Sequence, residues 1–327
     1  MFVENTAMKK RFVAEFRNLK YIIDNADSIL LVAHARPDAD TVGANLALRE
    51  YIQSLHKTVD IACFDSFPKA LEPLFSAEFI DLDTLDLSRY STIIACDSVD
   101  RGFDKVVDRI SEDQVVVLID HHPDIFLKGD VVIIDTDYSS SSELVYFFFK
   151  QHNIKITPAI AAMLLTGIIF DTGGFQHKSV SSDVMDVASD LVKKGGHPAI
   201  ISQVLFSHNN ISALKLWGKA FYKAKLNPGN GMIVTAVTQA DIDECRASAE
   251  DIYQVASILS TVPDAKFSLV LSERPDNIIR ASLRSISDHN VDVSAIAKQF
   301  GGGGHRLASG FEIMGKLMET EDGWVVV

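Results

Sequence analysis

The stretch LLVAHARPDADTVGANLAL, residues 30–48, decides how the chain begins to fold. It opens on a continuous apolar run, which is typical of a strand buried on both faces of a parallel sheet. Residues 41–55 then place apolar side chains at helical spacing and predict a helix. Between strand and helix stand His34, Asp38 and Asp40. These residues form either an ordinary polar turn, in which Asp38 or Asp40 caps the helix, or part of a metal site.

The alternation of strand and helix continues along the chain. Further strands are predicted at 58–64, 92–98, 114–122 and 131–135, followed by helices at 141–152 and 158–172. This pattern is typical of an α/β domain with a mostly parallel sheet. After a Gly/Pro break at 193–198 comes a helical stretch at 199–225, and then a smaller α/β unit with strands at 232–238, 267–273 and 278–285 and a helix at 291–300. We therefore expect two domains, 1–195 and 229–327, joined by a helical linker at 196–228.

Composition excludes several classes of protein. Hydrophobic residues make up 47% of the 327 residues and charged residues 23%, as in ordinary globular proteins. No run approaches the ~18 apolar residues of a membrane span, and the N-terminus lacks a signal-peptide core, so we expect a cytoplasmic protein. The three cysteines are too few and too widely spaced for a disulfide framework or a zinc–thiolate site. A net charge of −13 argues against binding to long duplex nucleic acid but leaves room for a small phosphate-bearing substrate.

Polar residues follow the predicted strands with unusual consistency. His34 ends the first strand, Asp97 ends the run IIAC, and the tripeptide 120–122, DHH, ends the run VVVLI. Asp171 closes the apolar helix at 158–172. Because ligands collect at the carboxyl ends of parallel strands, where the strand order reverses, we expect these side chains to meet.

The charges of this set indicate a metal centre. Each segment alone is more often a turn, a helix cap or a solvated histidine pair, but four such segments along one sheet edge favour a shared site. Burying four carboxylates without compensation would be prohibitive, whereas two divalent cations would balance them: Asp38, Asp40, Asp97 and Asp171. Imidazole and carboxylate ligands without thiolate suit Mn²⁺ best, with Mg²⁺, Co²⁺ or Zn²⁺ as alternatives.

The motifs HARPDAD (34–40), CDS (96–98), DHH (120–122) and FDTGGF (170–175), in this order, resemble the four motifs of the DHH phosphoesterase superfamily. SLRS (282–285) and FGGGGHRLASG (300–310) resemble its DHHA1 domain. The resemblance implies a catalytic domain at 1–195, a substrate-binding domain at 229–327 and an active site in the cleft between them. It also implies one metal on His34, Asp38 and Asp97, and a second on Asp40, Asp97, His121 and Asp171. Asp120 would orient a histidine and His122 would face the substrate, so that Asp97, Asp120 and His122 carry the catalysis.

Length and domain make-up are most similar to the bacterial nanoRNase/pAp-phosphatase group of this superfamily. The resemblance implies a Mn²⁺-dependent hydrolase of ester bonds, acting on nanoRNA, on linear dinucleotides such as pApA and pGpG, or on 3′-phosphoadenosine 5′-phosphate (pAp), and it suggests a homodimer. Two alternatives stay open: a cyclic-dinucleotide phosphodiesterase and a catalytically silent nucleotide-binding module. A RecJ-type exonuclease, which needs further DNA-binding domains, and a family II pyrophosphatase, which lacks the GGGGH motif, fit less well.

The glycine run at 301–304 is either a floppy loop or an anion site. It stands between a predicted helix and a predicted strand, and consecutive glycine amides can approach a phosphate closely. Arginine and histidine side chains nearby would add charged donors. We therefore predict substrate binding by a set of residues in the second domain: Arg284, Ser285, Gly302, Gly303, Gly304, His305 and Arg306.

Overall fold

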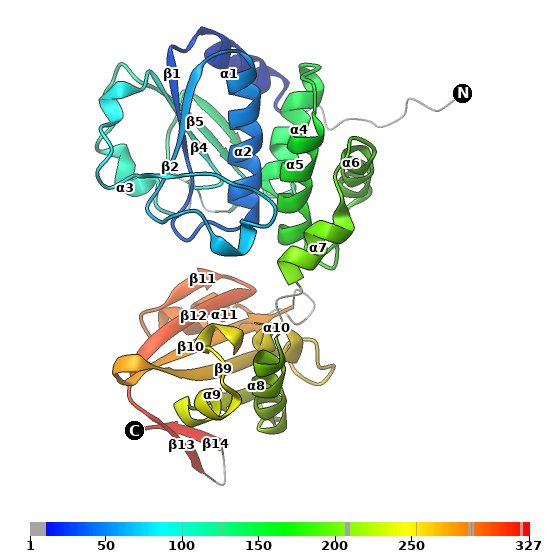
Figure 1. The fold of residues 1–327 in the computed structure, drawn as a ribbon. Helices are drawn as coiled ribbons and strands as arrows, with labels where there is room; N and C mark the ends of the chain where they lie inside the picture. The colour runs from blue at the N-terminus through cyan, green and yellow to red at the C-terminus, as the bar shows by residue number, and fades with distance from the viewer. Residues whose placement is uncertain are drawn as a thin grey trace. The chain divides into compact units, whose positions relative to one another are not determined.

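The computed structural model describes residues 11–99, 101–123, 125, 127–206, 210–252, 254–286, 289, 291–320 and 323–327, and for residue 305 the backbone alone. The chain divides between residues 207 and 208 into two compact units, each with its own six-stranded sheet (Figure 1). This confirms the predicted α/β fold with two sheets. Within the described ranges, no helix has the length and apolarity that crossing a membrane requires.

The first unit is built on a parallel sheet. Its strands lie in the order β3-β2-β1-β4-β5-β6, and every neighbouring pair is parallel. The order reverses between β1 and β4, which is where an open α/β sheet leaves a crevice at its carboxyl edge. The strand bounds are β1 Ser28–Val32, β2 Thr58–Cys63, β3 Ile80–Asp81, β4 Thr92–Cys96, β5 Val115–Asp120 and β6 Val131–Ile134.

Helices cover both faces of this sheet, which explains why its longer strands are largely apolar. Leu31 of β1 packs into a core with helices α1, α2, α4, α5 and α6, while Leu30 and Val32 pack on the opposite face with α3. Figure 1 shows α2, α4 and α5 side by side. The helix bounds are α1 Val13–Asn25, α2 Ala39–Ser54, α3 Asp104–Val107, α4 Ser141–Gln151, α5 Pro158–Asp171, α6 Ser182–Lys193 and α7 Pro198–Phe206.

Two glycines let α5 approach its neighbours closely. A Cβ added at Gly43 of α2 would lie 2.3 Å from the backbone oxygen of Met163 in α5. A Cβ at Gly167 of α5 would lie 2.4 Å from Asp40 Oδ1 and 2.1 Å from Ser142 Oγ. No side chain fits at such distances, so the absence of a Cβ at Gly167 brings the backbone of α5 against Asp40.

The second unit has a mixed sheet in the order β11-β12-β10-β9-β8-β7. β8 and β9 pair in parallel, and its other pairs run antiparallel. The strands are β7 Lys225–Asn227, β8 Met232–Val237, β9 Phe267–Arg274, β10 Ile278–Ser285, β11 Gly303–His305 and β12 Ala308–Met314, with β13 Leu317–Thr320 and β14 Gly323–Val326 forming a separate ribbon. The helices are α8 Ile211–Tyr222, α9 Gln239–Cys245, α10 Val255–Leu259 and α11 Val293–Lys298.

The structure differs from the sequence prediction in several elements. The helical stretch predicted at 199–225 contains two helices, α7 in the first unit and α8 in the second, and residues 207–209 between them lie outside the described ranges. The glycine run does not form a loop throughout, because residues 303–305 pair with β12 as strand β11. Short elements such as β3 and the β13–β14 ribbon, and also helix α6, were not predicted from the apolar pattern.

Candidate metal centre

The first group of candidate ligands follows β1. His34 is 1% exposed, and its Nδ1–H donates to the backbone oxygen of Ala35 at 2.8 Å. This bond directs Nε2 towards two carboxylates, 3.3 Å from Asp38 Oδ2 and 3.8 Å from Asp97 Oδ2. Nε2 is buried and makes no hydrogen bond of good geometry to any described residue. A buried polar atom in this state is costly unless something else binds it, as a cation would.

The second group joins three distant segments. His121 follows β5, Asp40 lies in the first turn of α2, and Asp171 is the last residue of α5. His121 Nε2 lies 2.9 Å from Asp171 Oδ2 and 3.9 Å from Asp40 Oδ2. Asp40 is fully buried. The structure therefore brings these three predicted ligands to one point at the carboxyl edge of the sheet.

Asp97 connects the two groups. It follows β4 with φ at +59°, a left-handed conformation that costs energy for a non-glycine residue and often marks a functional position. Its Oδ2 faces His34, while its Oδ1 lies 3.7 Å from His121 Nε2. Among the described residues, three overlapping sets present ligand atoms within 4.8 Å of one another: His34–Asp38–Asp97, Asp40–His121–Asp171 and Asp97–His121–His122.

The electrostatics of the centre favour cations. Burial, reinforced by neighbouring carboxylates, raises the pKa of Asp40 to about 7 and those of Asp97 and Asp171 to about 6. Burial alone would lower the pKa of His34, but the adjacent Asp38 carboxylate outweighs it and raises this pKa to about 9. In the same way Asp171 outweighs burial and raises the pKa of His121 to about 10. The centre thus binds extra protons, which divalent cations would replace.

Asp120 organises the DHH tripeptide. It is fully buried, and its Oδ1 accepts from the backbone N–H groups of His121 and His122 at 2.8 and 3.0 Å, and from the His122 ring Nδ1–H at 2.8 Å. Its Oδ2 accepts from the backbone N–H of Val99 at 2.9 Å, which ties in the loop after β4. The histidine ring that donates to Asp120 is therefore that of His122.

The sequence assigned no functional role to two residues of this neighbourhood, one of them a histidine for which it favoured a solvated or core position. Arg101, in the loop after β4, places one guanidinium nitrogen 3.1 Å from His122 Nε2 and another 3.6 Å from Asp38 Oδ2. His177 places Nδ1 2.8 Å from the backbone oxygen of Asp171. The one available signal for Arg101 was its position four residues after Asp97, at a strand end, and no comparable signal existed for His177.

The residues predicted in the second unit meet around one end of its sheet. Arg284 in β10 and His305 in β11 both register with Ala308, from opposite sides of β12. The side chain of residue 305 lies outside the described set. Ser285 is buried and donates its hydroxyl to the backbone oxygen of Lys266 at 3.1 Å, a bond that holds the sheet together. Arg306 lies in the turn between β11 and β12.

The glycines of this motif differ in whether a side chain would fit at their position. A Cβ at Gly302 would lie 2.2 Å from the backbone oxygen of Gly310, and one at Gly304 would lie 2.6 Å from that of Ala308. Both positions need glycine for β11 to pack. A Cβ at Gly303 would meet nothing within 4 Å, so the backbone there borders open space that a ligand can enter.

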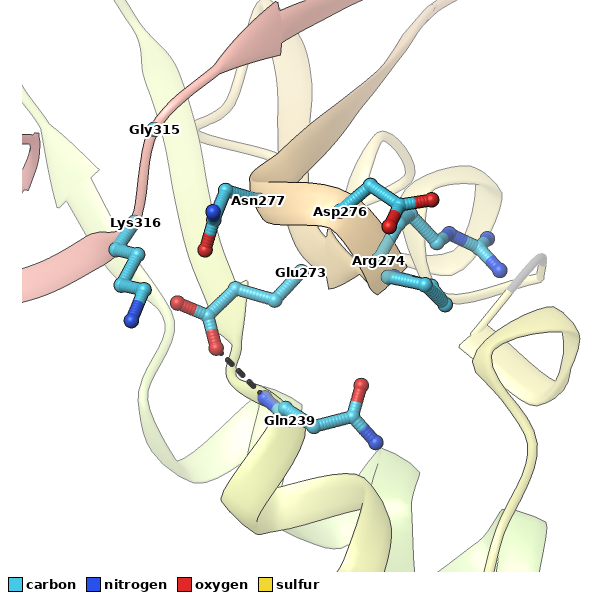
Figure 2. Close-up of a pocket in the computed structure, with 8 residues that line it drawn as sticks. Gln239, Glu273, Arg274, Asp276, Asn277, Gly315 and Lys316 are labelled. Carbon is cyan, nitrogen blue, oxygen red and sulfur yellow. Dashed lines mark hydrogen bonds between the residues drawn. The ribbon is translucent and has the colours of Figure 1, made fainter.

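A cavity of about 490 Å³ lies elsewhere in the second unit, at the β9–β10 turn (Figure 2). Its lining includes Glu273, whose two oxygens accept from the backbone N–H groups of Gln239 and Leu317 at 2.7 and 2.9 Å, and Arg274, which pairs with Glu250 at 2.7 Å. These charges hold the turn together. The cavity lies at the end of β10 away from Arg284 and overlaps none of the candidate ligand sets, so we do not place the site there.

Comparison with known proteins gives a consistent result. Residues 28–168 match the family model described as DHH family, N-terminal domain, and residues 229–321 match that of the DHHA1 domain. A Bacillus subtilis protein named bifunctional oligoribonuclease and PAP phosphatase NrnA is 26% identical over 291 residues, covering 88% of this chain and 90% of its own. A Streptococcus mutans protein named as a probable NrnA is 28% identical over 312 residues, covering 94% and 96%. The crystal structure of an exopolyphosphatase-related protein from Bacteroides fragilis superposes with a TM-score of 0.84 at 25% identity, covering 93% and 92%.

Proposed function

We propose that this chain, which belongs to the DHH family and carries a DHHA1 domain, hydrolyses phosphoester bonds in short oligonucleotides and in pAp. The observation that carries the proposal is the position of Asp97, whose two oxygens face two different groups of candidate ligands. The B. subtilis and S. mutans relatives, which match over nearly their whole lengths, are named for these two activities. Substrates of this size agree with an acidic chain of net charge −13.

The cofactors we propose are two divalent cations, with Mn²⁺ preferred. One would be held by His34, Asp38 and Asp97, and the other by Asp40, Asp97, His121 and Asp171. When bound, such cations lower the pKa of water towards neutrality and withdraw charge from phosphoryl oxygens. The residues fit them, because the donor set is imidazole and carboxylate and because His34 Nε2 is buried without a good hydrogen bond from the described residues.

Arg101 and His122 would act on the substrate itself. The Nδ1–H of His122 donates to Asp120, so its Nε2 is the acceptor that receives the Arg101 N–H. An incoming phosphate would compete for the Arg101 guanidinium, whose planar donors match phosphate oxygens well. Imidazole exchanges protons near neutral pH, so the freed Nε2 of His122 could take up a proton from water and would then be suited to donate it to the leaving oxygen.

The second unit would hold the other end of the substrate. We propose that Arg284, His305 and Arg306 bind a terminal phosphate together with the backbone of Gly302–Gly304, with Ser285 fixing the end of β10. The register of β10 and β11 on β12 supports this proposal.

The experiment that tests the function is a substrate panel on metal-free protein resupplied with Mn²⁺, Mg²⁺ or Co²⁺. The panel contains pApA, pGpG, pAp and a cyclic dinucleotide. We expect Mn²⁺ to support the fastest hydrolysis of the linear substrates, and Asp97→Asn to lower kcat by at least about a hundredfold. Asp113→Asn, at an exposed carboxylate in a turn of the same unit, is the control and keeps full activity.

Three results would overturn the assignment. Full activity of Asp97→Asn would rule out the metal centre as the catalytic site. Faster hydrolysis of the cyclic dinucleotide than of the linear substrates would transfer the function to cyclic-dinucleotide cleavage. Binding of nucleotides without turnover under any metal would identify a catalytically silent module.

A further inference from the structure

Four consecutive serines, Ser139–Ser142, stand at the N-terminus of α4, and all four are buried. Two of them serve the helix itself. Ser139 donates its hydroxyl to Glu143 Oε2 at 2.9 Å, and Ser140 caps the helix by accepting from the backbone N–H of Glu143 at 3.1 Å. The other two, Ser141 and Ser142, contact candidate metal ligands.

The backbone of this helix terminus holds Asp40. The N–H groups of Ser141 and Ser142 donate to Asp40 Oδ2 and Oδ1 at 2.7 and 2.9 Å. These groups have no partner within the helix, and the helix dipole favours a negative charge there. A carboxylate that is fully buried therefore receives two backbone hydrogen bonds from a segment 101 positions away in sequence.

Side-chain hydroxyls hold Asp97 in a similar way. Ser141 Oγ donates to Asp97 Oδ1 at 2.9 Å, and Thr41 Oγ1 donates to Asp97 Oδ2. Each oxygen of this carboxylate thus receives one hydroxyl, and each has a further lone pair available. Because Oδ1 faces His121 and Oδ2 faces His34, the two hydroxyls fix the rotation of the carboxylate with one oxygen towards each group.

We propose that Ser141 and Thr41 are positioning residues that make Asp97 a bridge between two cations. The inference rests on the proposed function. Without the hydroxyls the carboxylate would be free to turn, and it would no longer present one oxygen to each group of candidate ligands. Ser141 is the more important of the two, because it contacts Asp97 through its side chain and Asp40 through its backbone. Losing a hydrogen bond to a metal ligand typically lowers metal affinity 10- to 100-fold, roughly.

The experiment is a calorimetric titration of metal-free protein with Mn²⁺, which does not depend on hydrolysis. Ser141→Ala removes the hydroxyl and keeps the backbone N–H. Ser139→Ala is the matched control, since it removes a buried hydroxyl and its hydrogen bond from the same serine run without touching a candidate ligand. We expect the unmodified protein and Ser139→Ala to bind two Mn²⁺ per chain with the same affinity. Ser141→Ala should bind Mn²⁺ more weakly by about tenfold or more, and Ser141→Thr, which restores the hydroxyl, should recover the affinity.

Thermal unfolding of the metal-free variants accompanies the titration. If Ser141→Ala does not fold, Thr41→Val and Thr41→Ser decide the question, because they remove and retain the second hydroxyl. Unchanged Mn²⁺ affinity in a folded Ser141→Ala or Thr41→Val protein, or equal loss in Ser139→Ala, overturns the inference and leaves the proposed function in place. If the unmodified chain does not bind two Mn²⁺, the result contradicts the proposed function itself.

Discussion

Asp38 divides its two carboxylate oxygens between the start of α2 and His34. Oδ1 accepts from the backbone N–H groups of Asp40 and Thr41 at 3.0 and 3.1 Å and so caps the helix, while Oδ2 lies 3.3 Å from His34 Nε2. The helix-cap interpretation of this turn is therefore correct, and it does not compete with the metal interpretation. The cap fixes the orientation in which Asp38 presents its second oxygen.

Asp38→Asn and Asp38→Ala separate these two roles. Asparagine caps helices about as well as aspartate, whereas alanine does not, so we expect the free energy of unfolding to be about 1 kcal/mol lower for Asp38→Ala than for Asp38→Asn. Both variants lose the charge that faces His34, and both should bind Mn²⁺ more weakly than the unmodified chain. Denaturant unfolding and Mn²⁺ titration measure the two effects. Equal stability of the two variants would contradict the capping role.

Gly167→Ala should damage the centre without altering any candidate ligand. The new methyl group would lie 2.1 Å from Ser142 Oγ and 2.4 Å from Asp40 Oδ1, so α5 must shift. We expect a loss of about 1–3 kcal/mol in unfolding free energy, together with weaker Mn²⁺ binding.

Gly218→Ala is the matched control for this change. Gly218 lies within helix α8, and a Cβ there meets nothing within 4 Å. This substitution should stabilise the protein by about 0.4–1 kcal/mol. Thermal denaturation compares the pair, and a Gly167→Ala protein as stable as the unmodified chain would refute the close-packing argument.

The metal-free protein should lose stability as pH rises. The pKa of His34 is raised from 6.5 to about 9, so the stability this histidine contributes is complete below pH 6.5 and is lost as pH passes 9. The pKa of Asp40 is raised from 3.8 to about 7, so the folded protein also loses stability as pH rises towards 7 and this carboxyl group ionises. Thermal unfolding from pH 6 to pH 9 in a chelator should show a falling midpoint.

With Mn²⁺ present, the stability of the protein should increase with pH instead of falling. Cations compete with protons for the same atoms, so Mn²⁺ affinity should increase across this pH range and stabilise the fold accordingly. The comparison at each pH is between chelated and Mn²⁺-saturated samples of one preparation. Metal-induced stabilisation that does not vary with pH would show that the raised pKa values do not belong to the metal-binding groups.

Arg101→Ala should impair substrate turnover more than metal binding. Its guanidinium contacts His122 and lies near Asp38, yet it is a cation and no ligand. We expect kcat/KM to fall by about 10- to 100-fold, as for the loss of one to two charge-assisted hydrogen bonds, with two Mn²⁺ still bound. Steady-state kinetics and Mn²⁺ titration check this, with Arg89→Ala, at an exposed arginine of the same unit, as control. Unchanged kinetics would exclude a phosphate contact.

Gly303→Ala and Gly302→Ala test the glycine motif in the second unit. A methyl group at Gly303 meets no atom within 4 Å, so the fold should be retained, but it would occupy the space that a phosphate needs and should raise KM about tenfold. A methyl group at Gly302 would lie 2.2 Å from the Gly310 oxygen and should destabilise the unit. A Gly303→Ala enzyme with unchanged KM would place phosphate binding elsewhere.

The sequence by itself determined the fold class and the family. Largely apolar runs predicted strands β1, β2, β4, β5 and β6, because a parallel sheet covered on both faces favours apolar residues at most positions. The motifs at the ends of these runs predicted which side chains would meet, because the carboxyl ends of parallel strands share one edge. The family resemblance rested on the same motifs and is confirmed.

Only the tertiary structure decided which residues support that site. Ser141 lies 44 positions from Asp97 in sequence, Gly167 reaches Asp40 only because α5 packs against α2, and Arg101 reaches His122 only because β4 and β5 are neighbours. Local periodicity also could not divide the stretch 199–225 into α7 and α8, since each helix packs on a different core. Periodicity reports which face of an element is buried, whereas hydrogen bonds and close approaches depend on which segments become neighbours in space.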